Sequence, residues 1–449
     1  MPLRKNTSNN LVTVLVAFIL MNVAFDDFGI RWSISIVLFS MLIFLDCYHN
    51  GMLVINRSIV CNCMLVFVGS VLFMFMFFDS RKDLETYSYM ITLVICGFLI
   101  YFAQTDFDQL TKVLRILIAA GTVVAVYICL MRFLPGIYQR VLYFLPQNVR
   151  EYNQFLLNQG YGVPVGGSIV YADYMISMII ITLFSAVLTG QEKAFIREKD
   201  RIILGTVVII TLAAMVFEQR RGEPLCLVAS LLLMAFTGIN KQSSFTKNRR
   251  VLLLFTGIAL LLAAFLFMKR FGSSSRFIAS TMQGLMAGDV SNGRISRWKK
   301  AVEIFCQNPI IGMGWGRFGN YYLGRNDVVT ELNIYKYVHN DYLNVLCETG
   351  IFGFIIIYIP LLILLILTIK LTKQLIINKR LNIIANPMAL TFSYICLGSQ
   401  YFWCLLACIE PILYKQMFLL YYSFTMICLK TILDYFLQNP DDKNREGGF

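Results

Sequence analysis

Long apolar runs recur along almost the whole chain, from Leu11 to Leu437. Most approach the length of about 20 residues that a helix needs to cross a bilayer. A backbone in lipid must satisfy its own hydrogen bonds, so a spanning segment is either a helix or a strand of a closed barrel. Barrel strands alternate apolar and polar residues, and these runs do not. The pattern therefore predicts an all-α polytopic membrane protein.

Composition agrees with lipid as the main solvent. Hydrophobic residues make up 58% of the 449 residues and charged residues only 14%, whereas a soluble domain carries about 25% charged residues. We expect 12 transmembrane helices, with 11 or 13 as alternatives because one run is short. The expected spans are 11–28, 32–48, 59–78, 87–104, 113–134, 168–189, 202–217, 224–239, 251–268, 350–369, 386–408 and 412–434.

The net charge of +13 would suggest nucleic acid as the partner of a soluble protein. In a membrane protein the excess of Lys and Arg in cytoplasmic loops accounts for it, and no nucleic-acid partner is expected. Placing both termini in the cytoplasm puts the basic segments 1–10, 190–201, 240–250 and 370–385 on the cytoplasmic side. The first span then reads as an uncleaved membrane anchor, in contact with membrane lipids.

The same topology divides the chain into four parts. Residues 1–268 hold nine spans and a first extracytoplasmic loop, 135–167; residues 269–349 form a large extracytoplasmic loop. Three spans fill 350–435, and a polar cytoplasmic tail follows at 436–449. Long loops escape the positive-inside rule, so the 10 Lys or Arg residues of the large loop need another reason. An anionic ligand and contact with lipid headgroups are the two explanations.

Two patterns stand out within the large loop. Residues 294–306 predict an amphipathic helix that ends before Pro309, with apolar positions at Trp298, Ala301, Val302 and Phe305. A glycine-rich turn follows, with glycines at 312, 314, 316 and 319. Such a turn can bring backbone amides close to phosphate oxygens, although a plain tight connection has the same composition.

His339 and Asn340 stand just before the tenth expected span. Imidazole accepts a proton near neutral pH, so His339 at the extracytoplasmic membrane surface could activate a hydroxyl group. Asn340 and the nearby Tyr342 could position a substrate. The alternative is an inert loop histidine. The loop tyrosines could stack on sugar rings or form an aromatic belt at the interface; they are Tyr321, Tyr322, Tyr335, Tyr337 and Tyr342.

Arginines provide the second functional signal. Arg220 and Arg221 lie between two expected spans, where guanidinium groups are costly unless they are paired. Glu218 and Glu223 are possible intramolecular partners. A bound pyrophosphate is the functional alternative, because Arg binds phosphate in a bidentate manner. Arg294 could supply a further cation.

The acids of the large loop are scattered and lack the spacing of metal ligands. Arginines in place of a metal ion are therefore the simpler hypothesis for binding a pyrophosphate, and we expect no metal and no cofactor. The 12 cysteines, most of them within apolar runs, are interpreted as small buried hydrophobic residues.

Three motifs in order carry a family resemblance. His339-Asn340, nine residues and Gly350-Ile-Phe-Gly353 form one. Asn292-Gly-Arg294 with Trp298, followed by Pro309-Ile-Ile-Gly312-Met-Gly314, forms the second. Arg221-Gly222 forms the third, with Arg220 where a serine is usual. Together they resemble the motifs of bacterial O-antigen ligases and of O-antigen and exopolysaccharide polymerases, over residues 215–355.

The resemblance implies a membrane glycosyltransferase of GT-C type that moves a glycan from undecaprenyl pyrophosphate and inverts the configuration. It implies that Arg221 and Arg294, with Arg220 as the other candidate, bind the pyrophosphate, and that His339 activates or holds the acceptor. A ligase would transfer the glycan to lipid A–core, which we favour slightly, and a polymerase to a lipid-linked repeat unit. Gly350 and Gly353 are expected to serve helix packing. A transporter or flippase, or a non-catalytic scaffold, remains the alternative.

Overall fold

The protein is described by a computed structural model over residues 58–78, 84–102, 105–144, 147–158, 169–195, 201–218, 220, 222–237, 293–323, 337–380 and 386–438. All regular elements in this part of the chain are helices. They are α3 (Ile59–Phe78), α4 (Leu84–Phe102), α5 (Phe107–Phe133), α6 (Pro135–Tyr143), α7 (Gln147–Asn158), α8 (Ile169–Thr189), α9 (Glu192–Phe195), α10 (Arg201–Phe217), α11 (Gly222–Thr237), α14 (Arg294–Gln307), α15 (Phe318–Leu323), α16 (Asp341–Arg380), α17 (Pro387–Leu406), the 3-10 helix η4 (Ile412–Tyr414) and α18 (Gln416–Gln438).

Apolar length identifies the chain as a multi-pass membrane protein. Five described helices are long and apolar enough to cross a bilayer: Phe107–Phe133, Ala172–Thr189, Asp341–Lys379, Pro387–Leu406 and Met417–Phe436. Three shorter apolar helices accompany them, over Ile59–Phe75, Gly205–Phe217 and Gly222–Thr237. The all-helical expectation is therefore confirmed for the described residues. The expected spans 11–28, 32–48 and 251–268 lie outside those residues, so the total of 12 stays a prediction.

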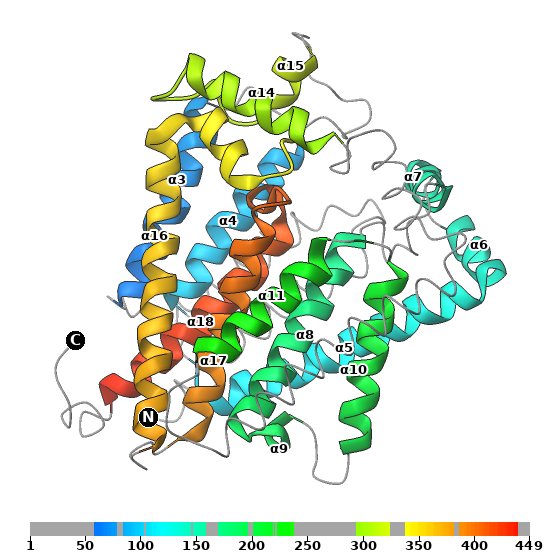
Figure 1. Ribbon diagram of the computed structural model, residues 1–449, viewed down its shortest axis with the longest axis vertical. Helices are drawn as coiled ribbons and strands as arrows, with labels where there is room; N and C mark the ends of the chain where they lie inside the picture. Colours follow the sequence, from blue (N-terminus) through cyan, green and yellow to red (C-terminus); the bar gives the residue numbers. More distant parts are fainter. Residues whose placement is uncertain are drawn as a thin grey trace, which may run out of the picture.

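The long helices pack side by side around α17 (Figure 1). Helix α17 contacts α8, α11, α16 and α18, and most of its side chains are buried. Helices α3, α4, α16 and α18 form one side of the bundle, and α5, α8, α10 and α11 form the other. Helix α14 lies across one end, against α16. This end, the α14 end, carries the candidate site.

Sequence patterning located most of the described elements. Helix α14 spans Arg294–Gln307, close to the predicted 294–306. Its residues Ala301 and Ile304 are buried, whereas the predicted core position Val302 is 46% exposed. The first expected loop, 135–167, contains the short helices α6 and α7. Helix α16 begins at Asp341, and the expected start of the tenth span, at residue 350, coincides with a break inside it.

Gly350 makes this break, because its φ of 64° and ψ of −171° interrupt the helical conformation. The freed backbone groups bind the glycine-rich turn. The amides of Ile351 and Phe352 donate to the carbonyls of Pro309 and Ile310 at 2.8 and 3.1 Å. In the opposite direction, the amides of Met313 and Gly314 donate to the carbonyls of Cys347 and Glu348 at 3.2 and 2.8 Å. The turn is thereby docked onto α16 through its backbone.

Two glycines allow this close approach. A Cβ atom at Gly350 would lie 2.3 Å from the backbone of Ile310, and one at Gly312 would lie 2.4 Å from the backbone of Glu348. Both residues have positive φ, 64° and 68°, which glycine adopts without steric cost. Gly353 packs against side chains and not against backbone, because a Cβ added at this position would overlap the side chains of Thr349 and Met74. The expected packing role of Gly350 and Gly353 is consistent with these contacts.

Replacing Gly350 with alanine should displace the docked turn. With φ 64° and ψ −171°, Gly350 lies in a backbone region that is essentially restricted to glycine, and the backbone overlap at Ile310 adds to the cost of a Cβ. We expect a lower thermal midpoint in detergent. The matched control is Gly69→Ala on α3, where a Cβ would meet nothing within 4 Å. An unchanged midpoint for Gly350→Ala would show that α16 does not need the docked turn.

Candidate active site

Three predicted site residues converge on one carboxylate at the α14 end, that of Glu410. The Nη2 atoms of Arg220 and Arg294 both donate to Glu410 Oε1, at 3.2 and 3.4 Å. The Nδ1 atom of His339 lies 3.6 Å from Glu410 Oε2. That distance is long for a hydrogen bond, so the contact is mainly electrostatic. Residues far apart in sequence therefore meet through Glu410, which lies in the turn between α17 and η4.

Arg220 is enclosed by acids from three elements. It pairs with Glu410, with Glu223 in the first turn of α11, and with Asp173 on α8, whose Oδ2 lies 3.9 Å from the Arg220 Nε. Its side chain is 12% exposed, and those of Asp173 and Glu223 are each 1% exposed. The expected intramolecular partner Glu223 is therefore present. We define the Glu410 network as these six residues: Asp173, Arg220, Glu223, Arg294, His339 and Glu410.

The turn that carries Glu410 is fixed to the start of α16. The backbone amide of Asp341 donates to the carbonyl of Ala407 at 2.7 Å, and the amide of Leu413 donates to Asp341 Oδ1 at 3.3 Å. The Tyr342 hydroxyl donates to the Cys404 carbonyl at 3.0 Å. On one side of these contacts are residues before and after Glu410 in the sequence. On the other side are Asp341 and Tyr342, which come shortly after His339. These contacts place the imidazole beside the carboxylate.

His339 itself has an uncommon backbone conformation. Its φ is 55°, the only positive value at a non-glycine residue in the described part of the chain. The left-handed conformation is unfavourable for residues with a Cβ and occurs often at functional sites. The next residue, Asn340, accepts a hydrogen bond from the Leu343 amide at 3.0 Å through its side-chain oxygen, as the residue preceding a helix does. Asn340 thus caps α16 and fixes the segment that presents His339.

The charges in the network favour an ionised Glu410. Burial opposes ionisation, but contact with His339 and the charges of Arg220 and Arg294 outweigh it and lower the pKa of Glu410 to about 2. The surrounding carboxylates of Glu223, Glu410 and Asp173 outweigh desolvation and raise the pKa of Arg220. The neighbouring Glu218 behaves differently, because burial and nearby acids raise its pKa well above the ordinary value. Glu410 is therefore the carboxylate that the cations hold in its charged form.

The glycine-rich turn already has an anionic partner within the protein. The amides of Gly316 and Phe318 donate to the two carboxylate oxygens of Glu348, at 2.7 and 3.0 Å. Trp315 is fully buried between the rings of Phe75 and Tyr414, with both centroid distances at 4.9 Å. Together with the backbone pairing of Met313 and Gly314, these contacts favour the tight connection over a phosphate cradle. The turn anchors α14 rather than presenting its amides to a ligand.

The other predicted site residues fall into two groups. Arg221 and Tyr335 lie outside the described residues. Tyr342 and Tyr337 are in aromatic contacts, Tyr342 with Tyr358 and Tyr337 with Tyr414, each with ring centroids 5.0 Å apart. Tyr321 is 48% exposed. Tyr342 therefore packs its ring against Tyr358 of the same helix and joins α16 to α17 through its hydroxyl, so its side chain has a structural role beside any role toward a substrate.

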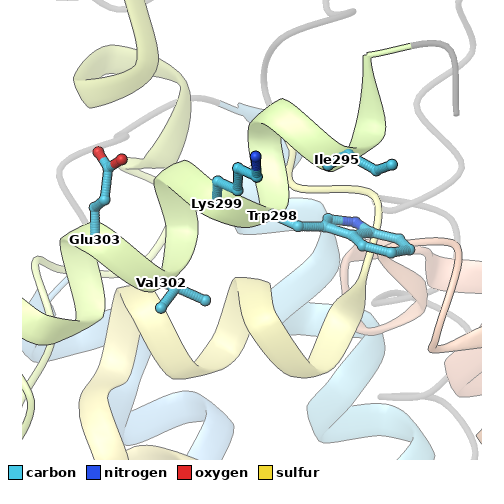
Figure 2. Close-up of a pocket in the computed structure, with 5 residues that line it drawn as sticks. All are labelled: Ile295, Trp298, Lys299, Val302 and Glu303. Atoms are coloured by element: carbon cyan, nitrogen blue, oxygen red, sulfur yellow. The ribbon is translucent and has the colours of Figure 1, made fainter. Parts of the chain in front are cut away.

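A shallow pocket on α14 shares no lining residue with the Glu410 network. Five α14 residues line it, Ile295, Trp298, Lys299, Val302 and Glu303 (Figure 2). Figure 2 shows Trp298 and Val302 directed toward the α16 side and Lys299 and Glu303 directed away from it. None of these five belongs to the network, so the pocket does not identify the reactive centre. Among the described residues, no group of three or more His, Cys, Asp or Glu side chains is placed to hold a metal ion.

Sequence reasoning missed Glu410 and Asp173. Glu410 stands in Ile409-Glu-Pro411, between the last two apolar runs, and Asp173 stands inside the apolar run of α8. Acids at such positions are costly in a membrane protein and mark functional sites. That signal was present in the sequence, but the partner of each acid depends on how the helices pack.

Neutralising Glu410 should destabilise the protein in a pH-dependent manner. The pKa of Glu410 falls from an ordinary 4.5 to about 2, so its charge stabilises the fold above about pH 4.5 and loses that effect as the pH falls toward 2. A shift of this size corresponds to about 3 kcal/mol. We expect Glu410→Gln to lower the thermal midpoint at pH 7 and the difference to shrink near pH 3. Glu303→Gln, with a side chain 60% exposed, is the matched control. A deficit as large at pH 3 as at pH 7 would contradict the ionic role.

Comparison with known proteins agrees with the geometry. A search of curated proteins finds no match. Residues 179–358 match the O-antigen ligase family. The matched segment contains Arg220, Arg294 and His339, whereas Glu410 lies beyond its end and Asp173 before its start. Over residues 179–358 the chain is therefore similar to the O-antigen ligase family, as its motifs led us to expect.

Proposed function

We propose that the protein transfers a glycan from undecaprenyl pyrophosphate to the hydroxyl group of an acceptor glycolipid, with lipid A–core as the favoured acceptor. The observation that carries the proposal is the convergence of two arginines and a histidine on Glu410 at one end of the helical bundle. The match of residues 179–358 to the O-antigen ligase family supports this reaction class. The reaction needs positive charge at the leaving pyrophosphate and a base at the acceptor, and the site offers both side by side.

Arg294 is the cation best placed to receive the pyrophosphate. Its side chain is 32% exposed, against 12% for Arg220. It is the first residue of α14, whose N-terminal end follows Gly293 and has no side-chain cap. A helix N-terminus attracts anions through its dipole and its amides. An anion at this position would therefore interact favourably with both the guanidinium group and the helix. Arg221 is the second proposed ligand.

His339 is the proposed base. Its Nδ1 faces Glu410, which leaves Nε2 for the acceptor hydroxyl. In the reaction the acceptor oxygen attacks the anomeric carbon, its proton passes to Nε2, and the bond from that carbon to the pyrophosphate oxygen breaks. The pyrophosphate leaves with the electron pair and is stabilised by arginine. Attack opposite the leaving group inverts the anomeric configuration. We propose no metal ion in this step.

A ligase and a polymerase would share these roles. They differ in the acceptor, which is a glycolipid core for a ligase and a second lipid-linked repeat unit for a polymerase. We favour the ligase because the spacing from His339-Asn340 to Gly350 and Gly353 is the strongest motif match. We propose that the site faces the extracytoplasmic side of the bacterial cytoplasmic membrane, with both termini in the cytoplasm. There the lipid carrier can present its glycan to the acceptor.

Substitution of His339 and Arg294 by alanine tests the proposal. Loss of a general base lowers turnover by about 10²–10⁴-fold, and loss of a charge-stabilising donor by about 10²–10³-fold. We expect both variants to abolish surface glycan in a deletion host at wild-type membrane levels of protein. Accumulated full-length glycan on the lipid carrier would indicate a ligase, and single repeat units would indicate a polymerase.

The matched control is Lys300→Gln, which removes an exposed cation of the same helix whose partner is Glu303. We expect wild-type glycan from this variant. Wild-type glycan from both His339→Ala and Arg294→Ala would refute the catalytic assignment and favour a transporter or a scaffold.

A further inference from the structure

Arg220 and Arg294 contact the same oxygen of Glu410 but differ in their surroundings. The Nε and Nη2 atoms of Arg220 face Asp173, Glu223 and Glu410. Arg294 contacts Glu410 Oε1 at 3.4 Å from a more exposed position. Family resemblance alone would treat these arginines as alike, as candidate pyrophosphate ligands. Their different surroundings indicate different roles.

A further anion would not be favoured at Arg220. Three carboxylates already face its guanidinium group, so the local charge around it is negative. Like charges at short distance repel strongly in a site shielded from water. Displacing one of these acids would leave a buried carboxylate without its cation, which costs several kcal/mol. Arg220 is therefore suited to hold protein carboxylates in place rather than to bind a phosphate.

We propose that Arg220 and Glu410 act as a positioning unit for His339, and that Arg220 is not a ligand of the pyrophosphate. This inference rests on the proposed function. Asp173 and Glu223 fix Arg220, Arg220 fixes Glu410 through Oε1, and Glu410 holds His339 through Oε2. The unit keeps Nδ1 of the imidazole directed inward, so that Nε2 is presented to the acceptor.

The two carboxylate oxygens of Glu410 allow it to contact the arginines and His339 at the same time. Oε1 receives the cations and Oε2 faces the imidazole. When the pyrophosphate draws Arg294 away, Arg220 remains on Oε1 and Glu410 keeps its place beside His339. The backbone supports the same geometry, because Ala407 and Leu413, which flank Glu410, are both hydrogen-bonded to Asp341. His339 is thus positioned by the contact of its ring with Glu410 and by the backbone that follows it, which is fixed at Asp341.

The packing of α11 contributes to the same arrangement. A Cβ at Gly222 would lie 2.3 Å from Cδ1 of Ile409, so the start of α11 fits closely against the residue before Glu410. This close contact keeps the segment that carries Arg220 next to the turn that carries Glu410. The positioning unit is therefore built where α8, α11 and the turn after α17 meet.

The test uses the purified full-length protein in detergent, with a lipid-linked glycan as donor and inorganic pyrophosphate as inhibitor. A misplaced catalytic group can cost about 10²-fold in rate. We expect Glu410→Gln and Arg220→Lys to lower kcat by about that factor, with KM for the donor within about threefold of the wild-type value, since neither residue binds the donor in this proposal. Inhibition by pyrophosphate should be no weaker than in the wild type.

Arg294→Gln should behave in the opposite manner. A hydrogen bond to a charged group contributes about 1.5–3 kcal/mol, so inhibition by pyrophosphate should weaken by about tenfold or more. Lys300→Gln and Glu303→Gln, which remove an exposed ion pair on α14, should match the wild type in every measurement. This contrast separates a ligand of the pyrophosphate from a positioning residue.

A double variant distinguishes positioning from a general structural effect. If Glu410 acts through His339, then His339→Ala/Glu410→Gln should have the same kcat as His339→Ala alone. Additive losses would overturn the inference, because Glu410 would then act independently of the imidazole. Weaker pyrophosphate inhibition in Arg220→Lys, comparable to that in Arg294→Gln, would also overturn it and make Arg220 a ligand.

Failure of the proposed function is a separate outcome. If the wild-type protein transfers no glycan and pyrophosphate does not change its thermal midpoint, the transferase proposal itself is refuted. If Arg220→Lys does not fold, Glu410→Gln and the double variant decide the inference, because the glutamine preserves side-chain volume and hydrogen-bonding capacity.

Discussion

The ionised carboxylate of Glu410 is the interaction on which the site depends. Two guanidinium groups from separate parts of the chain would repel one another if they met without a counter-charge. One buried acid between them makes the arrangement stable, and they in turn hold its pKa at about 2. The network therefore joins α11, α14, the start of α16 and the turn after α17. Removing the acid would leave these side chains without their common partner.

A second constraint is the docking of the glycine-rich turn onto α16. At Gly350 the regular backbone hydrogen bonding of α16 is interrupted. Residues 309–314 form hydrogen bonds with the backbone groups that are freed there. The carboxylate of Glu348 accepts hydrogen bonds from two further amides, those of Gly316 and Phe318. This docking orients α14, and α14 begins with Arg294. A sequence that looks like a phosphate-binding turn therefore serves to place an arginine, because a protein carboxylate occupies the position that an external anion would take.

The site combines a rigid part with a more accessible part. Asp173, Arg220 and Glu223 are buried and mutually paired, whereas Arg294 and His339 are partly exposed. Preorganised charges of this kind stabilise a transition state without rearranging during the reaction. The positive φ of His339 fits the same interpretation, since an unfavourable backbone conformation persists only where the surrounding contacts enforce it.

Membrane-crossing helices could be predicted from the amino-acid sequence alone, because long apolar runs without alternation can satisfy their backbone hydrogen bonds in lipid only as helices. Periodicity and length located α3, α4, α5, α8, α10, α11, α14, α17 and α18. His339 and Arg294 could also be identified as candidate site residues from the sequence, because ionisable side chains next to apolar spans are energetically costly and often functional. Only the tertiary structure identified Glu410 as their common partner and showed that acids enclose Arg220. Ion pairs between distant segments depend on which helix ends meet, and that is decided by side-chain packing across the whole bundle, which local periodicity does not encode.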